Sequence, residues 1–148
     1  MRHLAAALVV ASAVAGCAGP PRGGGTDGFA THCDGSGACK VSVSVSGCVI
    51  TPDPATLDVD AKNINIFWEL DAASSVSYRF PDDGVRLKAA SSEFDEPEAQ
   101  GFRKKFKLHD KNTLSGTTHR YEYAIKVQKL EWFKWVDCPI LDPWVVNH

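Results

Sequence analysis

Long apolar runs are missing from this chain of 148 residues. The longest, Leu4–Val14, has eleven apolar or small residues. At about 1.5 Å of rise per residue it is too short to cross a hydrocarbon core of roughly 30 Å. Arg2 precedes the run, and the small residues Ala15 and Gly16 follow it, as in an export signal. We therefore expect residues 1–16 to be a signal peptide that is removed.

An excess of charge of one sign is also missing. Residues 1–16 contain one charged residue, Arg2, so the rest of the chain has 15 of the 16 Lys and Arg against 18 Asp and Glu, a net charge near −3. This balance gives no electrostatic reason to expect a nucleic-acid partner. It also lacks the polybasic character that holds a protein on anionic lipid without an acyl chain.

The set of ligands that a copper centre needs is incomplete. A blue-copper site needs two histidines, a cysteine thiolate and usually a weak axial thioether, and the only methionine is Met1, inside the expected signal. In an exported chain Cys138 is expected to be oxidised, which removes the thiolate. We therefore predict no metal site from the candidate ligands, which are His109, His119, Cys138 and His148.

Catalytic motifs are lacking as well. No Gly-x-Ser-x-Gly elbow is present. The acidic cluster Glu93, Asp95, Glu96 and Glu98 does not have the spacing of a calcium-binding loop. The sequence thus predicts no catalytic residue and no bound cofactor, and it indicates a protein that is not an enzyme.

Helical periodicity is absent too, and alternation with a period of two takes its place. Such alternation, rich in β-branched and aromatic residues, predicts half-buried strands. Ala89–Gln100 is the best place for a short helix or an acidic loop, since Pro97 opposes a long helix. We expect an all-β, antiparallel two-sheet sandwich of about seven to eight strands over residues 40–148. The alternating runs are Val41–Val45, Leu57–Val59, Ile64–Leu70, Phe102–Leu108 and Tyr121–Val127.

Apart from Cys17, four cysteines remain, an even number that predicts two disulfides in an oxidising compartment. Three pairings are possible. The strand expected between Cys39 and Cys48 holds these two about 30 Å apart, whereas a disulfide needs Cα atoms within about 7 Å. We favour Cys33–Cys39 and Cys48–Cys138.

The segment Val14-Ala15-Gly16-Cys17 resembles the lipobox of bacterial lipoproteins. The resemblance implies cleavage before Cys17 and acylation of that cysteine, and several acyl chains make a lasting membrane anchor. Ala18 is not the aspartate that favours inner-membrane retention in this family, so the resemblance implies an outer-membrane address, facing the periplasm or the cell surface. Residues 17–39 are rich in Gly and Pro and predict a flexible tether.

The later part of the chain resembles immunoglobulin- or cupredoxin-type sandwiches, in particular small exported bacterial proteins. The resemblance rests on Pro52-Asp53-Pro54, on the central tryptophan of Ile64–Leu70, on Tyr121–Val127 and on the terminal Asp142–Asn147 segment. It implies an architecture and no activity.

Two surfaces are candidates for partner contact. Arg103, Lys105 and Lys107 would line the outer face of a strand and could meet an anionic envelope component or an acidic protein; alternatively they are a solubilising face. Trp132 and Trp135 lie in the aromatic segment Leu130–Trp135, which we interpret as a strand with aromatic residues on both faces. Such tryptophans are typical interface anchors; alternatively they pack on the sandwich.

We therefore expect a lipid-anchored envelope protein that acts as a non-enzymatic binding or accessory module. One alternative is an inhibitor or immunity protein that blocks a cell-wall hydrolase or toxin through a protruding loop at residues 89–101. Another is a metal-binding redox protein. The sequence does not determine the oligomeric state or the identity of the partner.

Overall fold

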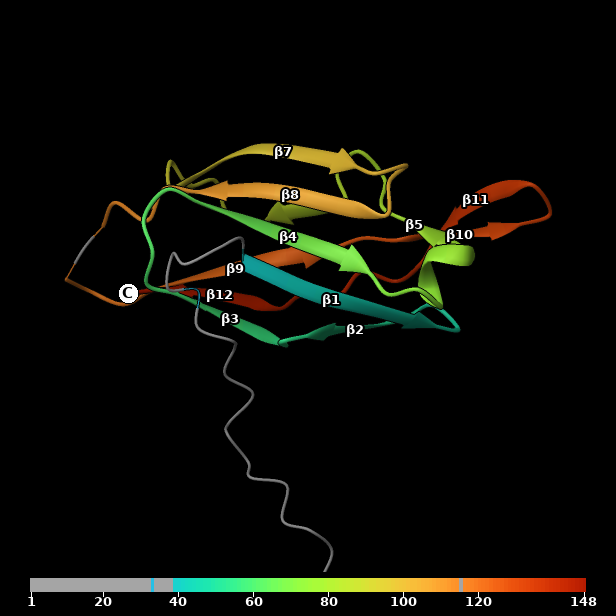
Figure 1. Cartoon of the computed structure of the whole chain (residues 1–148), viewed down its shortest axis with the longest axis horizontal. Coiled ribbons are helices and arrows are strands. Elements are labelled where there is room, and N and C mark those ends of the chain that lie inside the picture. The colour runs from blue at the N-terminus through green and yellow to red at the C-terminus, as the bar shows by residue number, and fades with distance from the viewer. Residues whose placement is uncertain (1–32, 34–38, 115) are drawn as a thin grey trace, which may run out of the picture.

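The computed structural model describes residues 33, 39–114 and 116–148, and nearly all regular secondary structure in this part of the chain is β-strand (Figure 1). The strands are β1 (Cys39–Ser46), β2 (Val49–Asp53), β3 (Thr56–Val59), β4 (Ile64–Leu70), β5 (Tyr78–Arg79), β6 (Val85–Leu87), β7 (Phe94–Gln100), β8 (Lys105–Asp110), β9 (His119–Ile125), β10 (Gln128–Glu131), β11 (Lys134–Asp137) and β12 (Trp144–Asn147). A short 3-10 helix, η1 (Ser74–Val76), accompanies them. The all-β prediction is confirmed. The strand number is higher than expected because several strands have only two to four residues, too few for alternation to reveal.

The strands form two main sheets and one small one. The first sheet has the order β2-β1-β4-β8-β7, the second β3-β12-β9-β6, and the small sheet β11-β10-β5. The two main sheets pack as a sandwich, and the small sheet continues from one end of it (Figure 1).

The expected antiparallel pairing holds for most strand pairs of the described residues, but two pairs differ. β1 pairs with β4 in parallel, and β3 pairs with β12 in parallel. The cause is a crossing of the chain between sheets. After the β1–β2 hairpin the chain enters the second sheet as β3, and it then returns to the first sheet as β4, in the direction of β1.

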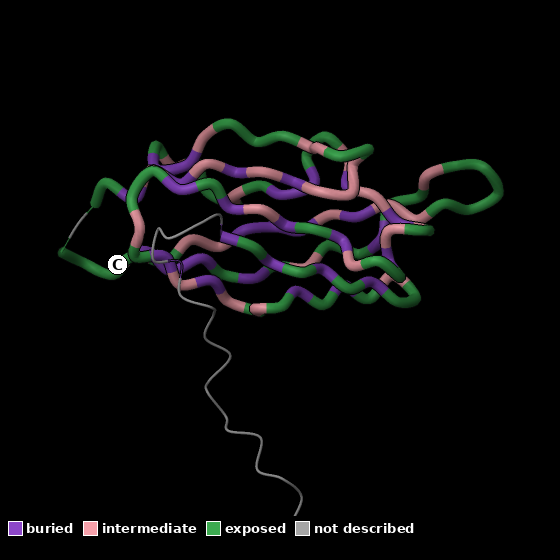
Figure 2. Tube along the Cα trace, in the orientation of Figure 1, coloured by how far each residue is buried: buried purple, intermediate pink, exposed green. Residues whose placement is uncertain are grey.

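The core lies between the main sheets, where the inward residues of the alternating strands are buried (Figure 2). Trp68 of β4 and Tyr123 of β9 meet there, with ring centroids 5.3 Å apart, and the Trp68 indole N–H donates a hydrogen bond of 3.2 Å to the Tyr123 hydroxyl. This bond satisfies two polar groups that would otherwise be costly to bury. Burial raises the pKa of the Tyr123 phenol, so Tyr123 remains a neutral donor and acceptor in the core.

Two disulfides close the fold, Cys33–Cys39 and Cys48–Cys138, and they are the pairs favoured from the sequence. Cys48 and Cys138 join the β1–β2 turn to the end of β11. Cys33 is buried and bridges Val59 of β3, and β1 already begins at Cys39. The domain therefore includes both cysteines of the first pair, although the sequence placed them in the tether.

Residues 94–100 correct another expectation. They form β7, which pairs with β8 at the edge of the first sheet, and not a helix or a loop. The register shifts between Asp95 and Glu98. Pro97 lies inside this irregularity on an edge strand, where the ladder needs no N–H from it. Pro97 is therefore compatible with this edge strand, although it would oppose a helix.

Candidate binding surface

A hairpin made of β10 and β11 projects beyond the rest of the sandwich (Figure 1). Only the first two residues of β10, Gln128 and Lys129, pair with β5. The Leu130 N–H then donates to the Ser77 carbonyl over 2.8 Å. From Glu131 to Lys134 the two strands pair only with each other. The hairpin therefore has a fixed base and a tip that stands free of the domain.

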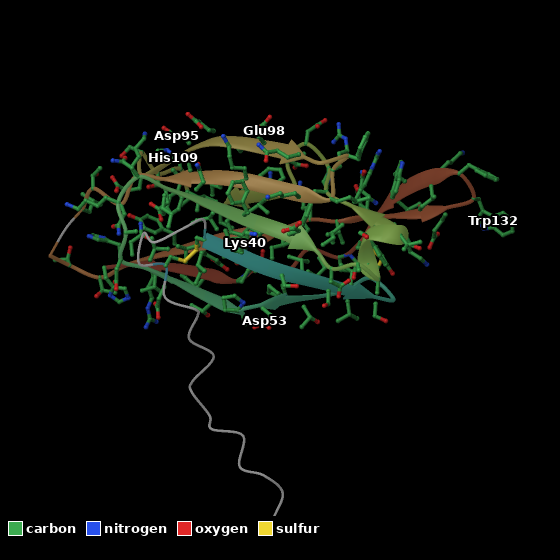
Figure 3. The ribbon with its side chains drawn as sticks, viewed as in Figure 1. Lys40, Asp53, Asp95, Glu98, His109 and Trp132 are labelled. Carbon is green, nitrogen blue, oxygen red and sulfur yellow. A yellow bond between two sulfur atoms is a disulfide. The ribbon has the colours of Figure 1, made fainter. Side chains whose placement is uncertain are left out.

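The tip of the hairpin consists of two large aromatic residues. Trp132 and Phe133 form a two-residue turn, with φ of 46° and 64°, and their side chains are 93% and 98% exposed. Figure 3 shows Trp132 at the far end of the hairpin. Positive φ at both positions is the signature of a turn that normally uses Asn-Gly, because a Cβ is unfavourable in this region. The fold thus holds two apolar side chains in water on a strained turn, an arrangement that adds nothing to folding.

The base of the hairpin is built around Trp135, which faces Leu130 across the strand pair. The Arg79 guanidinium carbon lies 4.2 Å from the centre of the Trp135 ring, and Arg79 Nε donates to the Gln128 side chain over 2.9 Å. The Lys104 Nζ lies 5.8 Å from the same ring centre and donates to the Tyr78 carbonyl over 2.7 Å. Two cations therefore share one aromatic ring.

This cation pair has no neutralising partner nearby. Among the residues that the structure describes, no carboxylate lies within 4 Å of Arg79 or Lys104. Burial, and then the charge of Arg79, lower the pKa of the Lys104 ammonium. A nearby anion would relieve this repulsion, which makes the base of the hairpin a favourable place for a negatively charged group.

Apolar side chains are concentrated at the same end of the molecule. Three of them lie on neighbouring segments: Val49 after the β1–β2 turn, Val76 in η1 and Phe102 in the β7–β8 turn, which are 68%, 77% and 98% exposed. We call this surface the hairpin end. It holds seven of the ten large apolar side chains that are exposed in the described part of the chain, and such clustering marks interaction surfaces. Its members are Val49, Val76, Phe102, Leu130, Trp132, Phe133 and Val136.

The basic residues Arg103, Lys105 and Lys107 do not form the free surface that the sequence predicted. Arg103 lies in the β7–β8 turn and pairs with Asp82 at 2.7 Å. Lys105 and Lys107 lie on β8, which is flanked by β4 and β7 and is not an edge strand. The Lys105 Nζ lies 4.2 Å from the centre of the Phe67 ring.

Lys107 belongs to a network of opposite charges on the outer face of the first sheet. Its Nζ lies 3.0 Å from a Glu96 oxygen and 3.8 Å from a Glu98 oxygen. Most of the acidic cluster lies on the neighbouring strand β7, and not in a loop. Its carboxylates therefore neutralise the charge of Lys107 locally. Asp95 and His109 lie beside each other at one end of β7 and β8, and Glu98 lies farther along β7 (Figure 3).

The copper ligand set is not assembled. Cys138 is bonded to Cys48, so it has no free thiolate. His109 Nδ1 lies 2.7 Å from Asp95, whereas His148 Nε2 contacts Asp58 at 3.3 Å and His119 contacts Thr117. In the residues described, no group of three or more His, Cys, Asp or Glu is arranged to hold a metal ion.

A buried polar cluster lies at the opposite end of the sandwich. Asp110 is fully buried, and its Oδ1 accepts hydrogen bonds from the Asn112 N–H (3.0 Å) and the Asn147 side-chain amide (3.1 Å). Burial raises the pKa of the Asp110 carboxyl to about 6. Asp110 Oδ2 and the side-chain oxygens of Asn112 and Asn147 have no hydrogen-bond partner. The cluster ties β8 to β12, but it does not open to the surface.

A surface hollow of about 510 Å³ lies between β6 and the segment after β11. Charged residues at this hollow already form ion pairs with each other. The Lys88 Nζ lies 3.0 Å from Glu122 and 2.7 Å from Asp142. This hollow therefore offers less to a ligand than the hairpin end, where the aromatic side chains are free.

Sequence reasoning identified Trp132 and Trp135 but interpreted the segment as one continuous strand. It did not identify Phe133 as a tip residue, nor Arg79 and Lys104. The turn lacks the Asn-Gly signal, and Arg79 is distant in sequence from Trp135. Lys104 carried one clue, because it interrupts the apolar side of an alternating run.

Cys17, the expected signal and the expected tether apart from Cys33 and Cys39 lie outside the described residues. In the part that is described, no helix is long and apolar enough to span a membrane. No family model matches the chain, and no curated protein is detectably similar to it in sequence.

Proposed function

We propose that the protein is an envelope lipoprotein, anchored through Cys17, whose sandwich domain is a non-enzymatic binding module with the hairpin end as its contact surface. The domain belongs to the immunoglobulin or cupredoxin type of sandwich in this proposal. The outer membrane is the proposed site of the anchor.

One observation carries the proposal: Trp132 and Phe133 are almost fully exposed on a turn that both residues disfavour. Folding alone would select Asn-Gly at these two positions. Exposed aromatic residues on a rigid hairpin are suited to binding, because they lose little conformational entropy when they are buried by a partner.

The position of the attachment point also supports this function. The chain enters the domain at Cys33 and at Cys39, the first residue of β1, and β1 runs from there toward the Cys48–Cys138 bridge at the hairpin end (Figure 1). Eight residues of strand span about 26 Å. The attachment point and the hairpin therefore lie at different ends of the domain, so the chain's attachment leaves the hairpin end uncovered.

Site-specific photo-crosslinking tests the proposal. A photoreactive phenylalanine analogue replaces Phe133 in one variant and Trp144, which is 44% exposed on β12, in the control. We expect envelope adducts, protein or lipid, to form at position 133 in clear excess over position 144. Equal yields at both positions would show that the hairpin end is not the contact surface.

The hairpin also favours a second function, inhibition of an envelope enzyme by insertion into its cleft. The segment 89–101, first considered for this role, is excluded as a protruding loop because residues 94–100 are the paired strand β7. A narrow two-residue tip has the right shape for a cleft. An adduct at position 133 with one hydrolase, together with loss of its activity, would favour this function.

A further inference from the structure

We infer that the hairpin end docks on a phospholipid bilayer that carries anionic headgroups, with the aromatic tip in the interface and phosphate groups at Arg79 and Lys104. The inference rests on the proposed function and names its partner. It goes beyond the acyl anchor, because it assigns a second and protein-made membrane contact to the domain.

The dimensions of the hairpin fit the bilayer interface. Trp132 lies two residues beyond Leu130, and Phe133 lies two residues beyond its cross-strand partner Trp135, the ring on which both cations rest. At about 3.3 Å per residue, the tip extends roughly 7 Å past the cation pair. Interfacial segments bury their apolar side chains about 5–10 Å into the headgroup and acyl boundary. With Arg79 and Lys104 among the phosphates, the two aromatic rings therefore reach that boundary, where tryptophan is enriched.

The exposed apolar residues come from separate segments. Phe102 lies on the β7–β8 turn with φ of 54° and an exposure of 98%, and Val76 lies on η1. A protein partner would need a separate pocket for each of these projections. A bilayer has no fixed surface shape and accepts all of them together.

The local charge is opposite to that of the whole chain. The hairpin (128–137), β5 and the turn 101–104 contain five Lys and Arg against two Asp and Glu, whereas the full chain has a net charge of −2. Lys129 pairs with Glu131 at 2.8 Å, and Arg103 pairs with Asp82. Arg79, Lys104 and Lys134 have no ion pair among the described residues and are left for phosphate oxygens, with which guanidinium and ammonium groups form strong hydrogen bonds.

Tryptophan fluorescence of the full chain carrying Cys17→Ser tests this inference without the acyl anchor. All four tryptophans lie in the described domain and none in residues 1–38, so the signal is blind to the N-terminal segment. The probes are vesicles of phosphatidylcholine alone and of phosphatidylcholine with phosphatidylglycerol, each with or without brominated acyl chains. We expect a blue shift and bromine quenching with the anionic vesicles. Trp132→Phe should lose most of the spectral change but still cosediment.

Three variants separate the contributions. Trp132→Asn with Phe133→Gly should abolish the vesicle response, and Leu114→Asn, an exposed apolar residue at the other end, should not. Because each basic residue near an anionic surface is worth about 1 kcal/mol, Lys134→Gln should weaken partition to anionic vesicles about fivefold. Lys62→Gln, with the same loss of charge away from the hairpin, should leave partition unchanged.

The outcomes also distinguish the inference from the proposed function. No spectral change with anionic vesicles, or a change that the double variant retains, would overturn the inference. If crosslinks at position 133 then join a single protein, the binding function stands and its partner is a protein. If position 133 gives no excess of crosslinks either, both proposals fail.

Discussion

The guanidinium of Arg79 lies over the ring of Trp135, 4.2 Å from its centre, and this stack joins β5 to β11. It fixes the base of the hairpin without any ion pair. Trp135→Ala removes the ring that contacts Arg79, Lys104 and Leu130. The variant loses a cation–π contact together with the partly buried surface of a large aromatic side chain. We expect the free energy of unfolding to fall by about 2 kcal/mol.

Amide hydrogen exchange locates this loss. Exchange of residues 128–137 should accelerate in Trp135→Ala and stay unchanged in Trp132→Ala, because the Trp132 side chain is 93% exposed and its removal takes away almost no buried contact. Equal acceleration in both variants would contradict the assignment of Trp135 as the base and Trp132 as the tip.

The Trp132-Phe133 turn leads to a prediction about stability. Replacing the pair by Asn-Gly relieves two residues with positive φ and removes no buried contact. We expect thermal or urea unfolding to show a gain of about 1–2 kcal/mol in the free energy of unfolding. A loss of stability would show that the aromatic pair supports the fold.

Asp110 leads to a prediction about pH. Its pKa is raised from 3.8 to about 6 by burial, against the opposing effect of the hydrogen bonds that it accepts from Asn112 and Asn147. A carboxyl with a higher pKa in the folded state binds its proton more tightly there, so its contribution to stability is present below pH 4 and is lost as the pH rises to about 6. The total is up to about 3 kcal/mol.

Asp110→Asn isolates this contribution. The amide oxygen can accept the two hydrogen bonds that Oδ1 accepts, and its NH₂ can donate to the unpartnered side-chain oxygens nearby. We expect the variant to be more stable than wild type at pH 7.5, with a difference that disappears near pH 4 in urea unfolding. A variant that is less stable at pH 7.5 would mean that the ionised carboxylate has a partner in solution.

The two disulfides should contribute unequally. Cys48–Cys138 joins residues 90 positions apart and Cys33–Cys39 residues 6 positions apart. Loop-closure entropy then gives about 4–5 kcal/mol for the long loop and about 2 kcal/mol for the short one. Unfolding of Cys48→Ser/Cys138→Ser and of Cys33→Ser/Cys39→Ser should show this order, and a reversed order would contradict it.

The lipid anchor is tested by Cys17→Ser in the producing cell. The variant should leave the membrane fraction after a high-salt wash, and its circular dichroism should remain that of a β protein, because Cys17 is far in sequence from β1. Retention of the variant in the membrane fraction at the wild-type level would show that the anchor assignment is wrong.

Much of the fold could be predicted from the sequence, because alternation reports burial directly. Val41, Val43 and Val45 point inward on β1, and Ile66 and Trp68 do so on β4. Strand directions could not be predicted, since a parallel pair such as β1–β4 depends on a crossing between sheets that leaves no local pattern. β7 was missed because its bulge breaks the alternation at Asp95–Glu98.

The binding surface was only partly predictable. Trp132 and Trp135 drew attention by composition, but one is exposed at a turn and the other is packed under Arg79, and alternation treated both as strand residues. The two tryptophans differ because the backbone turns at Trp132 and Phe133. Neither position has the Asn or Gly that normally indicates such a turn. The role of Lys105 and Lys107 was missed because their partners, Phe67 and Glu96, lie on neighbouring strands, and the strand pairing that brings them close leaves no local pattern in the sequence.

Hydrogen–deuterium exchange of the chain, with and without the envelope fraction of the cells that make it, tests the central claim most directly. We predict that exchange slows at residues 128–137 and 101–104 when the envelope fraction is present, and stays unchanged at 56–59 and 144–147. Protection confined to the latter strands, or none at residues 128–137, would contradict the claim that the hairpin end is where this protein makes contact.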